Sequence, residues 1–236
     1  MTNEKRSIPV SDGTLMEAHV AYPAPADARG GAILVIQEVF GVNSHIRDVT
    51  DRFAQEGYLA LAPDLFHRTA PWFQGQYDDL DGARKHAFAT TPEGMAADLS
   101  AAHQWLNENC PTHRVAAVGF CFGGLLSVVA NAQLPLACAV SYYGSTAYLG
   151  KFAGDDFATR VHGPQLFFWG GLDRFIDLDA RALATEPLRR AGKPFVSVEF
   201  SDADHGFNCD ARASYNQEAA VQAWNMTLGF LRQHLG

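Results

Sequence analysis

Short apolar segments recur along the chain and alternate with segments whose apolar residues are spaced three or four positions apart. The first pattern is typical of strands buried on both faces, and the second of amphipathic helices. The first predicts strands at residues 31–38, 58–63, 114–120, 136–144, 164–171 and 194–200. The second predicts helices that begin near residues 43, 91, 122, 179 and 214, with a weaker helical segment at 77–89.

Local signals mark the ends of several of these helices. Asn43 or Ser44 is suited to cap the first helix, and Gly57 follows it where helices commonly end in the left-handed conformation. Thr91 and Pro92 place a capping hydroxyl before a proline at the first helical position of the third helical segment. These signals support the boundaries that the apolar spacing suggests.

The alternation of strands and helices predicts an α/β fold with right-handed crossovers and a mostly parallel sheet covered on both faces. We expect about seven to eight strands. The sequence shows no internal repeat and no linker, so we expect one domain over residues 1–236. Ligands of such sheets bind beyond the carboxyl ends of the strands, so functional residues are expected just after strands.

Composition narrows the class of protein. Of 236 residues, 47% are hydrophobic and 19% are charged, which is typical of a globular chain and excludes a disordered one. The net charge is −8 without a basic run, so we expect no nucleic-acid or anionic-membrane partner. No apolar segment approaches the length of a membrane span, and residues 1–14 lack the apolar core of a signal peptide. The four scattered cysteines are expected to be thiols, which predicts a cytoplasmic protein.

Cys121 is the candidate nucleophile. It stands at the centre of GFCFGG (residues 119–124), between a predicted strand and a predicted helix. This is the spacing of a nucleophile elbow, with cysteine in the usual place of serine. The helix dipole at this position favours the thiolate. A buried structural cysteine among packing glycines is the alternative, and the strand–turn–helix setting favours the nucleophile.

His205 and Asp173 are the candidate base and acid. His205 follows the strand predicted at 194–200, and Asp173 follows the strand predicted at 164–171. Asp177 and Asp179 lie further from a strand end and are typical of loop and helix-cap residues. The order Cys121, Asp173, His205 matches the nucleophile, acid and base order of α/β-hydrolases. Three independent placements therefore agree on one triad.

Glu38 ends the first predicted buried strand, where a carboxylate is costly unless it is paired or protonated. It either reaches solvent at the strand end or lies beside the Cys121 sulfur. In the second case the backbone N–H groups of Val39 and Phe122 are positioned to form an oxyanion hole. No metal-ligand or nucleotide-binding motif is present, so we expect neither a metal nor a cofactor.

At these residues the chain closely resembles the dienelactone hydrolase (carboxymethylenebutenolidase-like) family of α/β-hydrolases, from about residue 8 onward. The markers are QEVFGVN (37–43), APDL (62–65), GFCFGG (119–124), YYG (142–144), GGLD (170–173) and HGF (205–207). The resemblance implies a Cys121–His205–Asp173 triad in a monomeric, cofactor-free cytosolic enzyme. It also implies that the resting thiol is neutral and that substrate binding frees Glu38 to take its proton. Tyr142 matches a tyrosine near the family's active site.

One departure from the family concerns substrate binding. Dienelactone-specific members hold the substrate carboxylate with two arginines, and one of those positions is Cys209 here. Arg84 is a plausible match for the other. Arg212, seven residues after His205, is expected to need an unusual loop to reach the same point. We therefore expect an uncharged small ester or lactone to be a better substrate than dienelactone.

The sequence thus predicts a hydrolase that cleaves an ester or lactone of a small molecule through an acyl-enzyme on Cys121. The chain is expected to be a monomer or a weak homo-oligomer. The first alternative is a broader carboxylesterase or thioesterase acting on small neutral acyl compounds. A non-catalytic binding protein on the same scaffold is disfavoured by the intact triad. A redox-sensing thiol protein is disfavoured because no resolving cysteine lies beside Cys121.

Overall fold

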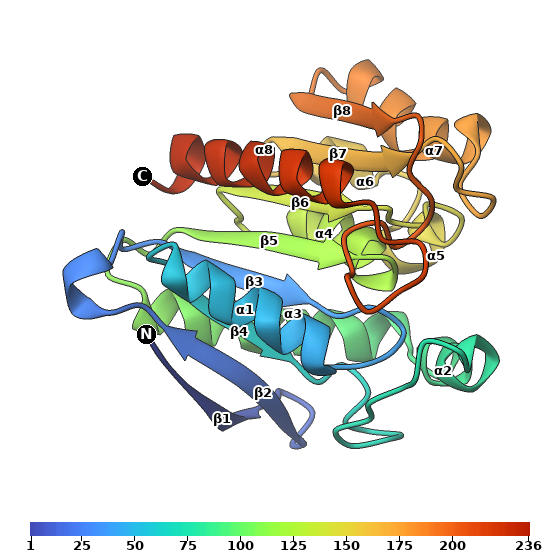
Figure 1. Cartoon of the computed structure of the whole chain (residues 1–236). Helices are drawn as coiled ribbons and strands as arrows, with labels where there is room; N and C mark the ends of the chain where they lie inside the picture. The colour runs from blue at the N-terminus through green and yellow to red at the C-terminus, as the bar shows by residue number, and fades with distance from the viewer.

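Eight strands form one sheet with the order β1-β2-β4-β3-β5-β6-β7-β8 (Figure 1). The computed structural model describes residues 1–236. Strand β2 is antiparallel to both of its neighbours, and all pairs from β4 to β8 are parallel. The strands are β1 (Thr2–Pro9), β2 (Leu15–Tyr22), β3 (Ala32–Ile36), β4 (Leu59–Pro63), β5 (Val115–Phe120), β6 (Cys138–Tyr142), β7 (Gln165–Gly170) and β8 (Phe195–Phe200).

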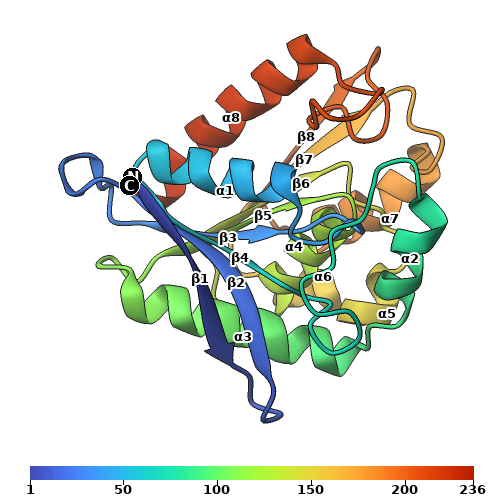
Figure 2. The same ribbon diagram turned by 60° about the horizontal axis from the view of Figure 1, so that its bottom comes forward.

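Helices cover both faces of the sheet, as Figure 2 shows. One face carries α1 (Ser44–Gln55) and α8 (Gln217–Leu235), which meet where Phe53 packs on Trp224 at 4.7 Å between ring centroids. The helices on the other face are α3 (Pro92–Asn109), α4 (Phe122–Gln133), α5 (Leu149–Ala153), α6 (Phe157–Arg160) and α7 (Leu178–Arg190). A short 3-10 turn, η1, spans Pro25–Asp27, and α2 (Leu80–Phe88) lies beyond the carboxyl ends of the strands. This arrangement confirms the predicted α/β-hydrolase fold.

The local signals that were read from the sequence act as expected. The Asn43 side chain accepts a hydrogen bond from the Ile46 N–H at 3.2 Å and caps α1. Thr91 accepts from the Gly94 N–H at 3.1 Å and caps α3. Gly57 follows α1 with a φ of +98°, a conformation that residues with a Cβ rarely adopt. Every residue of β3, β4, β5, β6 and β7 is buried, as their continuous apolar character predicted.

The N-terminal hairpin of β1 and β2 was not predicted. Strand β1 is exposed at every position except Ile8, because it lies at the edge of the sheet. An exposed edge strand lacks the apolar pattern from which strands are predicted. Its charged residues, such as Lys5 and Arg6, disfavour pairing of this edge with other chains. The short helices α5 and α6 were also missed, since one turn carries no helical period.

The parallel strands direct their carboxyl ends to the same side of the molecule (Figure 1). Cys121 directly follows β5, Glu38 lies two residues after β3, and Asp173 lies three residues after β7. His205 lies on the loop that follows β8. The fold therefore brings these four residues together at the carboxyl ends of the parallel strands. None of the helices combines the length and hydropathy that crossing a membrane requires.

Candidate active site

Cys121 occupies a strained turn between β5 and α4. Its backbone has a φ of +53° and a ψ of −111°, a region that non-glycine residues seldom adopt. The turn is tight because glycines let backbone segments meet: a Cβ on Gly119 would lie 1.8 Å from the Gly123 carbonyl oxygen. A Cβ on Gly123 would lie 2.1 Å from the Ile36 carbonyl oxygen. The elbow therefore depends on these glycines, and it holds the partly exposed Cys121 side chain at the start of α4.

His205 is fixed by Asp173. The Asp173 Oδ2 atom lies 2.7 Å from His205 Nδ1, and both residues are buried. The other oxygen of Asp173 accepts the Phe175 backbone N–H at 2.8 Å, which holds the carboxylate in place. Because Nδ1 is engaged with Asp173, Nε2 is the ring nitrogen left for Cys121. Asp177 caps α7 by accepting the Ala180 N–H at 2.8 Å, so it has the capping role expected for it.

The electrostatics of His205 reflect these neighbours. Burial alone disfavours the charged imidazolium. The charge on the Cys121 sulfur and the hydrogen bond with Asp173 outweigh burial and raise the pKa of His205 to about 10. The arrangement thus favours a proton on the imidazole whenever the neighbouring sulfur is a thiolate.

Glu38 does not reach solvent: its side chain is fully buried. Its Oε1 atom lies 3.4 Å from Arg212 Nη1, while Oε2 has no hydrogen-bond partner. The guanidinium of Arg212 lies 5.8 Å from the ring centroid of Phe40 and 5.7 Å from that of Tyr77. Burial opposes the charge of Arg212, but the Glu38 carboxylate raises its pKa.

Arg212 lines the cavity, and it does so through the unusual loop that it was expected to need. The chain after His205 is not helical but folds into consecutive turns, with the Cys209 N–H bonded to the Gly206 carbonyl and the Arg212 N–H to the Cys209 carbonyl. Gly206 has a φ of +82°, and a Cβ there would lie 2.4 Å from Arg212 Nη1. The absent side chain of Gly206 is thus what allows the guanidinium to lie against the loop backbone.

A cavity of about 370 Å³ lies beside these residues. Twelve of its 17 lining residues are hydrophobic, so the cavity favours a substrate with an apolar body. Cys121, His205, Val39 and Phe122 all line it. Phe122 is the first residue of α4, and the first N–H groups of a helix have no partner within the helix. Val39 and Phe122 both lie at the wall of the cavity that Cys121 lines.

Arg84 lines the cavity from α2, with its guanidinium 5.3 Å from the ring centroid of Phe175. Tyr142 does not line the cavity, and its expected role in substrate binding needs correction. Its side chain is buried in the core, with its hydroxyl 2.7 Å from the Thr227 hydroxyl. The next residue, Tyr143, has a φ of +40° and lies 5.2 Å from His205 between ring centroids. Side chains alternate along a strand, and the bend after β6 turns the second tyrosine toward the site.

Cys209 is buried and is absent from the cavity wall. Its sulfur donates a hydrogen bond to the Tyr77 hydroxyl at 3.1 Å. Burial and the nearby Glu38 charge raise the pKa of the Cys209 thiol to about 11. Cys209 is therefore a neutral thiol at neutral pH, and Arg212 rather than Cys209 lines the cavity.

Comparisons with known proteins identify relatives along the whole chain. The dienelactone hydrolase family profile matches residues 16–235. A provisionally named carboxymethylenebutenolidase of Escherichia coli O157:H7 is 34% identical over 243 residues, covering 98% of this chain and 86% of the relative. The carboxymethylenebutenolidase of Pseudomonas putida is 32% identical over 237 residues, covering 98% of this chain and 97% of the relative.

A solved structure from Klebsiella pneumoniae subsp. pneumoniae, provisionally named a dienelactone hydrolase, superimposes with a TM-score of 0.88. It is 33% identical and covers 98% of both chains. The sequence match and the fold match agree. This chain therefore belongs to the dienelactone hydrolase family, and it is a hydrolase that acts on the ester or lactone bonds of small molecules.

Proposed function

We propose that Cys121, His205 and Asp173 form a catalytic triad that hydrolyses an ester or lactone through an acyl-enzyme. The observation that carries the proposal is the 2.7 Å contact between Asp173 and His205, made beside a cysteine on a strained elbow in the same cavity. A buried acid that orients an imidazole toward a nucleophile is the arrangement that activates weak nucleophiles in hydrolases.

In the first half of the reaction, His205 is protonated, the Cys121 thiol gives its proton to the Glu38 carboxylate, and the sulfur attacks the carbonyl carbon of the substrate. The bond from that carbon to the alcohol oxygen then breaks, and His205 gives a proton to the departing oxygen. With a lactone, the alcohol stays attached to the acyl group. In the second half, His205 removes a proton from water, and the resulting hydroxide attacks the thioester. The carbon–sulfur bond breaks, the carboxylate product leaves, and the sulfur regains its proton from Glu38.

The Val39 and Phe122 N–H groups serve as the oxyanion hole in this proposal. Removing one such donor in other hydrolases costs about 10²–10³ in kcat, so the pair supplies a large share of the rate. Asp173 keeps the imidazole in the tautomer that presents Nε2 to the sulfur, and it stabilises the imidazolium that forms.

Glu38 is the group we assign to activating the thiol. Its Oε2 atom is buried without a partner, and Oε1 is held only by the 3.4 Å contact with Arg212. An anionic substrate that draws the Arg212 guanidinium toward itself would leave the Glu38 carboxylate buried and uncompensated. A carboxylate in that position gains strongly from taking a proton, and the Cys121 thiol is the donor that the proposal provides.

The substrate class follows from the cavity wall. Three cationic side chains, Arg84, Lys151 and Arg212, line a cavity that is otherwise mostly apolar. The cysteine at position 209 argues for uncharged esters, but Arg212 at the cavity wall removes the basis for that expectation. A small ester or lactone that carries a carboxylate and an apolar body fits this wall best.

The test is hydrolysis of p-nitrophenyl acetate and of a dienelactone by the parent enzyme and by Cys121→Ala. The proposal predicts a loss of about three orders of magnitude or more in kcat/KM for both substrates. Cys138→Ala is the matched control, because it removes a buried thiol at the amino end of β6, away from the carboxyl ends of the strands. The triad would be refuted if Cys121→Ala kept its activity. It would also be refuted if rapid-quench mass spectrometry of the parent enzyme detected no acyl-enzyme.

A further inference from the structure

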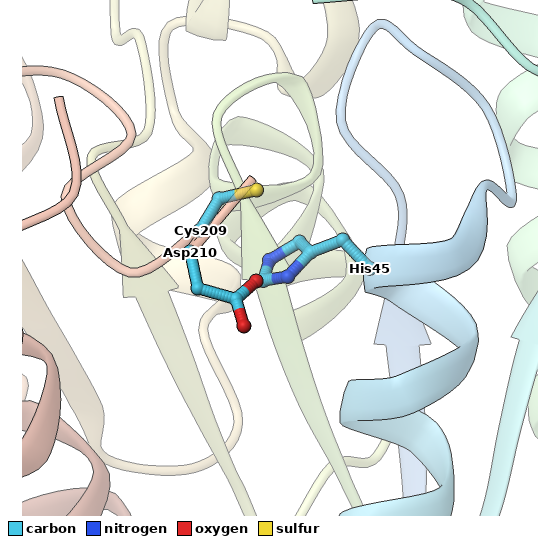
Figure 3. Close-up of side chains that lie close together, drawn as sticks. All are labelled: His45, Cys209 and Asp210. Atoms are coloured by element: carbon cyan, nitrogen blue, oxygen red, sulfur yellow. The ribbon is translucent and has the colours of Figure 1, made fainter. Parts of the chain in front are cut away.

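A second group of chemically active side chains lies outside the catalytic cavity. His45 projects from α1, and Cys209 and Asp210 lie on the loop between β8 and α8 (Figure 3). One ligand atom from each residue, a ring nitrogen, a sulfur and a carboxylate oxygen, lies within 4.8 Å of the others. Figure 3 shows the His45 ring pointing from its helix toward the two loop residues. None of the three takes part in the proposed reaction.

His45 has a buried ring nitrogen that is free to bind a partner. Only 6% of its surface is exposed, and its Nε2 atom is buried without a hydrogen-bond partner. An unpartnered buried polar atom costs about 1–3 kcal/mol, so this nitrogen gains from any partner that the group provides.

A small polar cavity of about 120 Å³ opens onto the group. His45 and Asp210 line it together with Asn208, Asp48 and Arg52. Asp210 is exposed, whereas His45 and Cys209 are buried, so two fixed ligands face one that is free to move. The cavity gives an ion and its remaining water ligands a path from solvent.

We propose that His45, Cys209 and Asp210 form a binding site for Zn²⁺ or a chemically similar divalent transition metal. Sulfur, imidazole nitrogen and carboxylate oxygen are the three protein donors that zinc takes, and a water completes the tetrahedron. Bonds of about 2.0–2.3 Å place tetrahedral ligands about 3–4 Å apart, so the group has to contract by about 1 Å. The exposed Asp210 side chain is the ligand that is free to move toward the two buried ones.

Metal binding requires one proton to leave. The Cys209 thiol becomes a thiolate that bonds to the metal, and its proton passes to solvent. The hydrogen bond from Cys209 to the Tyr77 hydroxyl is lost in the same step. Tyr77 and the Cys209 backbone both contact Arg212, which lines the catalytic cavity. A change at Cys209 can therefore shift a residue of the cavity wall.

Co²⁺ is the probe for this site, because tetrahedral Co²⁺ is coloured and a bound thiolate adds a charge-transfer band. The titration uses full-length Cys121→Ser, which removes the catalytic sulfur as a competing ligand. We expect one equivalent of Co²⁺ to bind with both spectral signatures and to be displaced by Zn²⁺. The thiolate band should vanish in Cys121→Ser/Cys209→Ser.

Two further variants in the Cys121→Ser background separate the ligands from their surroundings. His45→Gln and Asp210→Asn should weaken Co²⁺ binding by about tenfold or more. Asp48→Asn is the matched control: it removes an acid from the same cavity and should bind Co²⁺ as the parent does. Circular dichroism checks that each variant is folded.

The proposal fails if Cys121→Ser shows no thiolate band with Co²⁺. It fails equally if the band persists without Cys209, or if His45→Gln and Asp210→Asn, once shown to be folded, bind as tightly as Asp48→Asn. Because metal binding is measured without substrate, its failure would leave the proposed hydrolysis untouched.

Discussion

The guanidinium of Arg212 lies 3.4 Å from the carboxylate of Glu38, although 174 positions separate the two residues in the sequence. The carboxylate is fully buried, and the arginine side chain is 17% exposed. A buried carboxylate without a partner would be strongly destabilising, so this pair explains how Glu38 is tolerated at the end of β3. Because Arg212 also lines the catalytic cavity, the same contact links substrate binding to the state of Glu38.

Glu38→Gln should lose most of its activity and keep its fold. The amide has nearly the same volume and can still accept a hydrogen bond from Arg212, but it cannot take a proton from the Cys121 thiol. We expect kcat/KM to fall by about two orders of magnitude, in the range of other lost acid–base groups. Steady-state kinetics with circular dichroism checks this. An unchanged kcat/KM would leave Glu38 with only a structural role.

The parent enzyme should prefer an anionic ester to a matched neutral ester. One charge-assisted contact to a carboxylate is worth about 1.5–3 kcal/mol, or roughly one to two powers of ten in binding. Arg84→Gln should raise KM for the anionic ester by about that factor and barely change KM for the neutral one. This residue is the cleaner probe, because no ion pair holds it to Glu38. Equal kcat/KM values for the two esters in the parent enzyme would contradict the proposed substrate class.

Cys209→Arg should not improve binding of an anionic substrate. The Cys209 side chain is fully buried and lies outside the cavity wall, so an arginine there would add a second buried cation near Arg212. We expect a loss of about 3 kcal/mol or more in the free energy of unfolding, measured by urea denaturation. Cys209→Ser serves as the control for loss of the thiol. A folded Cys209→Arg enzyme with a lower KM for the anionic ester would show that the loop accommodates an arginine at either position.

His205 should make stability depend on pH. Burial opposes its charge, but Cys121 and Asp173 raise its pKa to about 10, whereas an unfolded histidine has a pKa of about 6.5. The folded state therefore binds this proton more tightly. Its stabilising contribution is complete below about pH 6.5, declines as the pH rises, and is lost above about pH 10.

The thermal midpoints of the parent and of His205→Gln, compared from pH 6 to pH 10, measure this contribution. The difference between them should shrink steadily across that range. Subtracting the variant removes the effect of every other group that titrates there. A difference that stays constant with pH would mean that the native state does not raise the pKa of His205.

The sequence determined most of the central sheet. Residues 115–120 and 165–170 are short continuous apolar stretches, the pattern of a strand covered on both faces. Asn43 and Thr91 cap their helices through contacts with the N–H three residues on, so these boundaries needed no tertiary information. The hairpin of β1 and β2 escaped because the edge strand is nearly all exposed, and its place depends on pairing with β4 through β2.

The residues of the proposed triad could be named from the sequence because Cys121 and Asp173 follow buried strands and His205 lies on the loop after β8. Parallel strands bring their carboxyl ends to the same side of the molecule. Arg212 and the His45–Cys209–Asp210 group could not be named in this way. The position of Arg212 depends on consecutive turns and on the space left by Gly206, and His45 meets Cys209 only because α1 and the β8–α8 loop pack together. Local patterns record which groups must be buried or must end an element. Tertiary packing alone decides which loop side chains meet, because loop contacts follow no period along the chain.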